Sequence, residues 1–128
     1  SVQDDGKYAS RFSAKPSGGL CAVLPKKCRE REKMIKIVAE HFVKEESRDS
    51  FIVLARDLVN ESRKETGNIS YHLCVDRADQ LHFTFIEEWQ DTNAIKAHNS
   101  SIHFSRIVPQ LRECAAKAGN SCFYDELY

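Results

Sequence analysis

The stretch from Leu81 to Trp89 alternates apolar and polar side chains, and this pattern constrains the fold more than any other. A period of two residues predicts a half-buried strand. The side chains predicted to share its buried face are Leu81, Phe83, Phe85, Glu87 and Trp89. Asp91 follows at once, and aspartate favours the N-cap of a helix. The chain is therefore expected to pass from a strand directly into a short helix.

The rest of the chain supplies the other elements of a single domain. Spacings of three and four residues predict a helix that Ser47 caps and that runs from 48 to about 66, with Gly67 as a left-handed C-cap. Strands are predicted at 34–43, 69–75 and 81–89, with a last strand within 121–128. A short helix is predicted to end near 99. Another helix is predicted from Ser100 or Ser101 to about 118, kinked at Pro109 and ended by Gly119. This order predicts an α+β, ferredoxin-like split βαβ fold with an antiparallel sheet.

Composition limits the classes of partner. The 128 residues carry 19 basic and 19 acidic side chains, so we expect no nucleic-acid partner. No apolar run has the length of a membrane span and no signal peptide is visible, so we expect no membrane partner. The five cysteines are odd in number and lack a Cys-x-x-Cys pair, which favours reduced thiols and a cytoplasmic protein. A Cys21–Cys28 or a Cys114–Cys122 bridge remains an alternative.

Two features concern organisation beyond the single domain. Residues 1–32 have weak periodicity and include Lys15-Pro-Ser-Gly-Gly19, so we interpret them as an N-terminal extension of a domain at 33–128. The sheet face opposite the helices is expected to carry Val38, Phe42 and Ile86. A half-covered sheet with apolar residues on its open face predicts a homodimer that packs sheet on sheet.

From about Met34 to Tyr128, the chain resembles the antibiotic-biosynthesis monooxygenase family, and in particular its small quinol-monooxygenase-like members. The residues that carry the resemblance are Gly67-Asn-Ile-Ser-Tyr71, Glu87-Glu-Trp89, Asp91, Ala94, Ala97-His98 and Ser101-x-His103-Phe104. Ile102 and Gln80 depart from the prolines that are common in the family. The resemblance implies a dimeric α/β barrel, a pocket between sheet and helices, and oxygenation of quinol or phenolic small molecules without a cofactor. It fixes the fold better than the reaction.

Cofactor-free oxygenation requires a base, a donor for the developing anion and a dry aromatic pocket. We predict His41, Glu87 and His103 as catalytic residues. The parity of the first strand points His41 toward the helices, and a carboxylate at Glu87 on an apolar face requires a partner or a raised pKa. His103, in the first turn of a helix, is expected to present a donor at the pocket mouth. A plain structural hydrogen bond is the alternative reading for each.

The predicted substrate-binding residues are aromatic or lie at a helix end: Tyr71, Trp89, His98 and Phe51. Trp89 has the alternative of being core, and His98 has the alternative of tying two helices together. No two histidines have helical i, i+4 or strand H-x-H spacing, so no metal site is predicted. Val108 and His41 stand where haem-degrading relatives carry a ligand histidine and an asparagine, which argues against haem. No glycine-rich turn indicates flavin or nicotinamide.

Two other functions remain open from the sequence. The N-terminus of the helix near Ser101 can hold a phosphate, so an isomerase or degrading enzyme for a small phosphorylated signal, such as an autoinducer-2 product, is an alternative. A non-catalytic small-molecule-binding dimer is the other.

Overall fold

The computed structural model describes residues 34–128. The predicted N-terminal extension, residues 1–32, and the Cys21–Cys28 alternative lie outside this range. Within it, Cys74, Cys114 and Cys122 are free, so the alternative Cys114–Cys122 bridge does not form.

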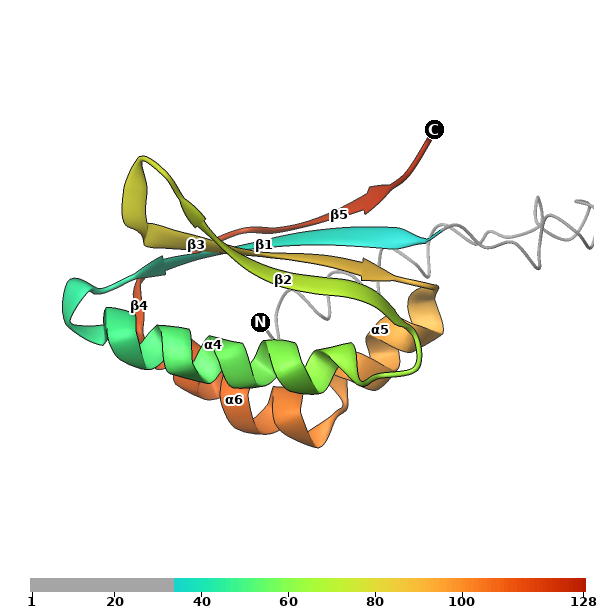
Figure 1. Ribbon diagram of the computed structural model, residues 1–128, viewed down its shortest axis with the longest axis horizontal. Coiled ribbons are helices and arrows are strands. Elements are labelled where there is room, and N and C mark those ends of the chain that lie inside the picture. Colours follow the sequence, from blue (N-terminus) through green and yellow to red (C-terminus); the bar gives the residue numbers. More distant parts are fainter. Residues whose placement is uncertain (1–33) are drawn as a thin grey trace, which may run out of the picture.

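One antiparallel sheet organises the described part of the chain (Figure 1). Its strands are β1 (Ile35–Val43), β2 (Asn68–Asp76), β3 (Asp79–Trp89), β4 (Ala115–Lys117) and β5 (Ser121–Asp125). The order is β2-β3-β1-β4, and β5 also pairs with β1, along the edge that β4 uses. Ile37 lies opposite Glu87 and His41 lies opposite Phe83, so these side chains share one face.

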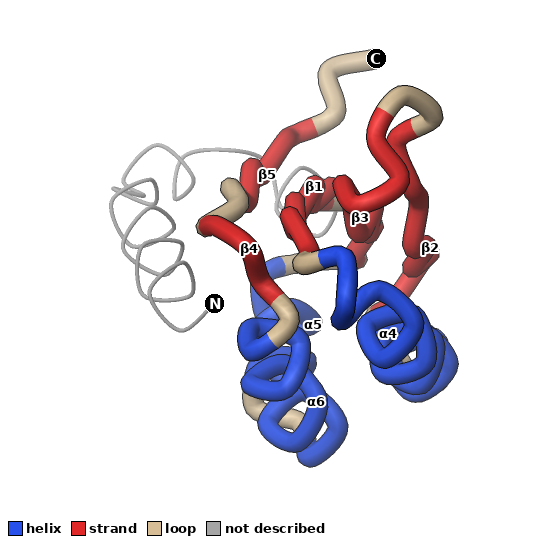
Figure 2. The backbone as a smooth tube through the Cα atoms, turned by 90° about the vertical axis from the view of Figure 1, so that its left-hand side faces the viewer, coloured by secondary structure: helices blue, strands red, loops and turns tan. Residues whose placement is uncertain are grey.

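The helices all cover the same face of the sheet, as the two ribbon views agree (Figures 1 and 2). They are a short 3-10 turn, η1 (Glu45–Ser47), followed by α4 (Arg48–Arg63), α5 (Thr92–Asn99) and α6 (Ile102–Glu113). Asp91 Oδ1 accepts a hydrogen bond from Ala94 N at 2.8 Å, and Ser101 Oγ accepts one from Phe104 N at 3.2 Å. These caps satisfy backbone donors that an isolated helix leaves open.

A core of apolar side chains fills the space between the two layers. Phe51 and Ala55 of α4 are fully buried, as is Trp89 of β3. The Phe51 ring packs on Phe83 with centroids 4.8 Å apart. The alternation of β3 and the stripe of α4 are thus confirmed as the two faces that meet.

The C-terminal third departs from the prediction. The last helix ends at Glu113 rather than near 118, and β4 occupies part of the predicted helix. Alanines there favour helix locally. The backbone instead pairs with β1, and Lys44 N donates to Cys114 O at 2.8 Å while Glu40 N donates to Asn120 O at 2.8 Å. Non-local pairing overrides the local preference.

Three local expectations were also wrong. Gly67 does not have a positive φ; it is required because a Cβ there would overlap Ala94 of α5. Gly119 does not end a helix, and a Cβ at that position would overlap the Glu40 carbonyl. Ser47 stands at the N-cap of α4, but its side chain makes no capping hydrogen bond.

The bulge in β2 explains why its apolar face is shorter than predicted. The register shifts between Asn68 and Ser70, and Asn68 Nδ2 donates to the carbonyls of Ser70 and Glu88. Ile69 is consequently 47% exposed, whereas Tyr71 is 2% exposed.

Candidate active-site cavity

A cavity of about 310 Å³ lies between the covered face of the sheet and the helices. Most of its wall is apolar or aromatic, contributed by Ile37, Ala39, Leu58, Phe85, Ile95, Phe104, Val108, Leu111 and Phe123. Its size and lining suit one small aromatic molecule. The polar residues that contribute to the wall, by side chain or backbone, are Glu40, His41, Tyr71, Glu87, His98, Asn99, Arg112, Lys117 and Ser121.

Glu87 places a buried carboxylate on this mostly apolar wall. It is 6% exposed, and its Oε1 accepts a hydrogen bond from Trp89 Nε1 at 2.9 Å. Burial raises the pKa of Glu87, and the nearby His98 together with the hydrogen bonds from Trp89 and Tyr71 only partly offsets this effect. A carboxylate with a raised pKa is a better proton acceptor than one in water.

Tyr71 stands beside Glu87 on the neighbouring strand β2. Burial, followed by the charge of Glu87, raises the pKa of Tyr71 well above the ordinary phenol value. The hydroxyl therefore keeps its proton and acts as a donor. The Tyr71 ring is 5.5 Å from His98 and 6.1 Å from Trp89, measured between centroids.

His41 reaches the cavity from β1. Its ring lies edge-on to Phe85 at 5.3 Å and tilted against Phe51 at 5.5 Å. These two aromatic contacts restrict the orientation of the imidazole. Phe51 itself is fully buried and is not among the residues that line the cavity, so the structure places it behind His41.

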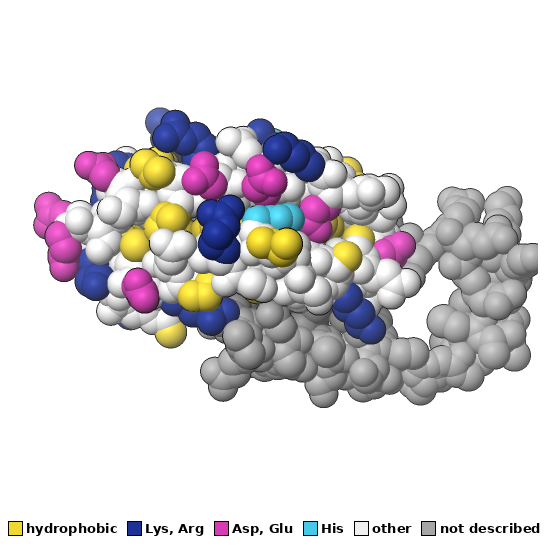
Figure 3. Space-filling model, turned by 90° about the horizontal axis from the view of Figure 1, so that it is seen from below, with side chains coloured by type: hydrophobic (Ala, Val, Ile, Leu, Met, Phe, Trp, Pro, Cys, Tyr) yellow, Lys and Arg dark blue, Asp and Glu magenta, His cyan; other side chains and the backbone are white. Residues whose placement is uncertain are grey.

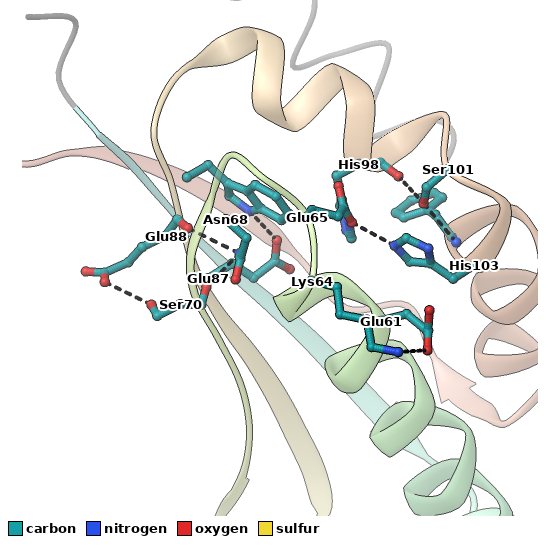
Figure 4. A network of polar contacts seen from close by, with 12 residues as sticks. Glu61, Lys64, Glu65, Asn68, Ser70, Glu87, Glu88, His98, Ser101 and His103 are labelled. Carbon is teal, nitrogen blue, oxygen red and sulfur yellow. Dashed lines mark hydrogen bonds and ion pairs between the residues drawn. The ribbon is translucent and has the colours of Figure 1, made fainter.

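His98 and His103 are brought together by Glu65, a residue that the sequence did not single out. Glu65 Oε2 accepts hydrogen bonds from His98 Nδ1 and from His103 Nε2, both at 2.7 Å (Figure 4). Burial raises the pKa of Glu65, but the hydrogen bonds from both imidazoles outweigh it and hold the pKa below the ordinary carboxyl value. His98 lines the cavity, whereas His103 does not.

The predicted site residues therefore divide into two groups. His41, Glu87, Tyr71 and His98 meet on the cavity wall. Trp89, His103 and Phe51 lie outside it, as a hydrogen-bond donor, a partner of Glu65 and a packing residue respectively.

Arg112 of α6 is a cavity residue that sequence reasoning missed. Its Nε is buried and has no hydrogen-bond partner among residues 34–128, although the side chain lines the cavity. A buried donor without an acceptor costs free energy, so its presence on a cavity wall suits an anionic ligand atom. The sequence did hold a signal for Arg112: it follows Val108 by four residues, and residues at this spacing lie on the same side of a helix.

The sequence that builds this cavity matches a known protein family. The model of the family described as "Antibiotic biosynthesis monooxygenase" matches residues 34–110. The chain belongs to this family. The match includes β1, β2, β3 and α5, which supply His41, Tyr71, Glu87 and His98.

Relatives of this family member agree in sequence and in fold. The chain is 38% identical over 80 residues to "Putative monooxygenase YcnE" of Bacillus subtilis (strain 168), covering 62% of this chain and 84% of that protein. It is similar to the crystal structure of a conserved protein from Methanosarcina mazei Go1, with a TM-score of 0.73, 31% identity, and coverage of 78% and 99% of the two chains. A crystal structure described as antibiotic biosynthesis monooxygenase gives a TM-score of 0.71 and 36% identity, covering 73% and 99%. The ferredoxin-like fold is thus confirmed.

Two positions that the sequence linked to haem and to phosphate can now be located in this monooxygenase-family fold. Val108, where haem-degrading relatives were expected to carry histidine, is 7% exposed and forms part of the cavity wall. Ser101, at the predicted phosphate-binding helix end, is not on that wall. Its hydroxyl donates to the His98 carbonyl at 2.7 Å and accepts from Phe104 N, so its one O–H donor is already used.

Among residues 34–128, no helix has the length and apolar character needed to cross a membrane.

Proposed function

We propose that this protein is a monooxygenase that inserts one atom of dioxygen into a small phenolic or quinol-type molecule. Family membership and the name of the Bacillus subtilis relative support oxygenation. The observation that carries the proposal is the Glu87 carboxylate, buried on the wall of a cavity that is mostly aromatic and aliphatic.

Glu87 is the proposed base. A phenol bound against Phe85 would place its hydroxyl within reach of the carboxylate, and the dry wall strengthens proton transfer from the phenol. Trp89 and Tyr71 orient the carboxylate through hydrogen bonds, and neither is required to react. His41 is the proposed second acid–base group, held in place between Phe51 and Phe85.

Arg112 is the proposed cation for the substrate oxyanion. Its Nε lacks an acceptor in the described part of the chain, and a phenolate oxygen would supply one. A charge-assisted hydrogen bond of this kind stabilises the anion that passes an electron to dioxygen.

The proposed reaction balances without a further reductant. A phenol carbon that bears hydrogen reacts with dioxygen and becomes a quinone carbonyl, and the second oxygen atom leaves as water. The phenolate first transfers one electron to dioxygen, and the two radicals combine to form a hydroperoxide. Loss of water from the hydroperoxide then gives the quinone, so the substrate supplies all four electrons.

Oxygen uptake with a panel of naphthols and hydroquinones tests the proposal. We expect turnover with quinone as product, and a fall of about 10²–10⁴-fold in kcat for Glu87→Gln, the range typical of a lost general base. Arg112→Gln should raise KM or lower kcat while the fold is retained. His72→Gln, on the opposite sheet face, is the control and should leave turnover unchanged. Absence of oxygen uptake by folded protein across the panel would refute the assignment, and turnover of a phosphorylated carbonyl compound instead would favour an isomerase.

We also propose that the open face of the sheet pairs two copies of this chain. Val38 lies between Ile86 and Cys122 in the register, and Ile86 is 40% exposed. Lys36 forms ion pairs on the same face with Glu88 and Glu126, so the face carries both signs of charge, as an interface between two identical copies allows.

Sedimentation velocity at micromolar concentration tests the dimer. Ile86→Asp should give monomers, whereas Val53→Asp should not, because Val53 is an apolar position on α4 that is 50% exposed and lies away from the open face. A monomeric parent protein would contradict the pairing.

A further inference from the structure

Glu65, His98 and His103 form a group of metal-ligand side chains beside the cavity, which His98 lines. Each offers one ligand atom, and the three atoms lie within 4.8 Å of one another. They come from the turn after α4, the last turn of α5 and the first turn of α6. We propose that this group binds one divalent transition-metal ion of the zinc class, which ties the end of α4 to the corner between α5 and α6.

The distances fit an ion once the side chains rearrange: the carboxylate must draw back, and the ligand atoms, which now lie within 4.8 Å of one another, must become evenly spaced. Tetrahedral zinc with ligands at about 2.0–2.1 Å separates neighbouring ligand atoms by roughly 3.3 Å. The two N···O distances to Glu65 are 2.7 Å, so each imidazole would move outward by roughly 0.6 Å. Two imidazoles and one carboxylate are a common ligand set for zinc and for the neighbouring first-row metals.

The local charge also favours a cation. With neutral imidazoles the group carries the negative charge of Glu65. The basic side chains that precede Glu65 are engaged elsewhere: Arg63 donates to the Tyr71 carbonyl at 2.9 Å, and Lys64 pairs with Glu61 at 3.0 Å. The Glu65 carboxylate instead accepts hydrogen bonds from the two imidazoles.

An ion can reach this group from solvent. The side chains of Glu65 and His103 are 15% and 16% exposed, whereas that of His98 is 3% exposed. Figure 3, which looks at the helix side of the molecule, shows imidazole surface that lies next to acidic and basic side chains. A water molecule from this side would complete four-coordination.

Trp89 provides a local probe of the site. It is the sole tryptophan of the chain, and its ring centroid is 4.6 Å from that of His98. A paramagnetic ion bound to His98 would therefore quench its fluorescence.

The experiment is a titration of the full chain with Co²⁺, followed by Trp89 fluorescence, with Zn²⁺ as competitor. We expect saturable quenching at one Co²⁺ per chain that Zn²⁺ reverses. Glu65→Gln and His103→Gln should each weaken binding at least tenfold. Both replacements retain side chains that hydrogen-bond, so the fold is expected to remain. Circular dichroism checks this, and His103→Gln decides the matter if Glu65→Gln does not fold.

His82→Gln is the matched control. His82 also lies between two carboxylates, those of Asp76 and Glu40, at 3.2 and 3.1 Å, but on the other face of the sheet. It should leave Co²⁺ binding unchanged. Quenching that does not saturate, or that persists unchanged in both Glu65→Gln and His103→Gln, would show that the group is a hydrogen-bonded tie alone. The readout does not involve oxygen uptake, so the metal proposal and the proposed function can fail separately.

Discussion

Replacing Glu65 with alanine removes the acceptor that joins two helices to the end of α4. Glu65 Oε2 receives both imidazole N–H groups at 2.7 Å. The His98 side chain is 3% exposed, so its Nδ1 would lose its partner without gaining water. We expect Glu65→Ala to lower the free energy of unfolding substantially, although Glu65 itself does not line the cavity.

The magnitude follows from the two hydrogen bonds. A hydrogen bond to a charged group contributes about 1.5–3 kcal/mol, and a buried donor left without an acceptor costs about 1–3 kcal/mol. His103 is 16% exposed and can turn toward water, so its share is smaller. The sum is about 2–4 kcal/mol, which for a domain of this size lowers Tm by roughly 10–20 °C. Glu65→Gln keeps an acceptor oxygen and should cost about 1 kcal/mol.

Urea unfolding in the presence of a chelator measures these hydrogen bonds without any metal contribution. Glu61→Ala is the matched control, because Glu61 lies one turn earlier and pairs only with the exposed Lys64. It should unfold like the parent protein. A Glu65→Ala variant whose unfolding free energy stays within about 0.5 kcal/mol of the parent would refute the reasoning.

Three further predictions concern the core and the cavity. Burial raises the pKa of Glu87 in the folded protein, so between the ordinary carboxyl pKa of ~4.3 and the raised value the folded chain holds a proton that the unfolded chain has released. The free energy of unfolding should therefore fall as pH rises through this window. Urea titrations at several pH values measure this dependence, and Glu87→Gln should remove it. A pH dependence that is unchanged in Glu87→Gln would contradict the assigned burial. Gly67→Val should destabilise the fold because a Cβ overlaps Ala94, and an unchanged Tm would show that the α5 contact is not tight. Phe51→Ala should cost about 3–5 kcal/mol in unfolding free energy and loosen His41, and a loss below about 1 kcal/mol would show that the ring is not core.

Sequence pattern was sufficient for elements whose information is local. The alternation from Leu81 to Trp89 gave a strand with Glu87 on the buried face, and Asp91 gave the cap of α5. These features depend on the strand period and on a side chain that bonds its own backbone three residues on. The family resemblance rested on the same motifs, and for this reason the fold was predictable before the structure.

Contacts between distant segments were not predictable in this way. β4 forms in a segment with helix-favouring alanines because β1 offers it backbone partners. A helix C-cap was expected to require Gly67. The requirement comes instead from Ala94, 27 positions away in the chain, which leaves no room for a Cβ at residue 67.

The candidate site shows the same division. Strand parity placed His41, Tyr71 and Glu87 toward the helices, and all three line the cavity. It could not distinguish a side chain that faces the cavity from one that supports it, so Trp89 and Phe51 turn out to lie behind their neighbours.

The sequence by itself determined the period of the main strands and helices, most of the residues on their buried faces, and the family. Only the tertiary structure decided which of those residues meet. Glu65, His98 and His103 illustrate the reason: their spacing in the chain has no helical or strand regularity. They converge because a helix end and a helix–helix corner pack together, and that packing is set by the whole core rather than by any local pattern.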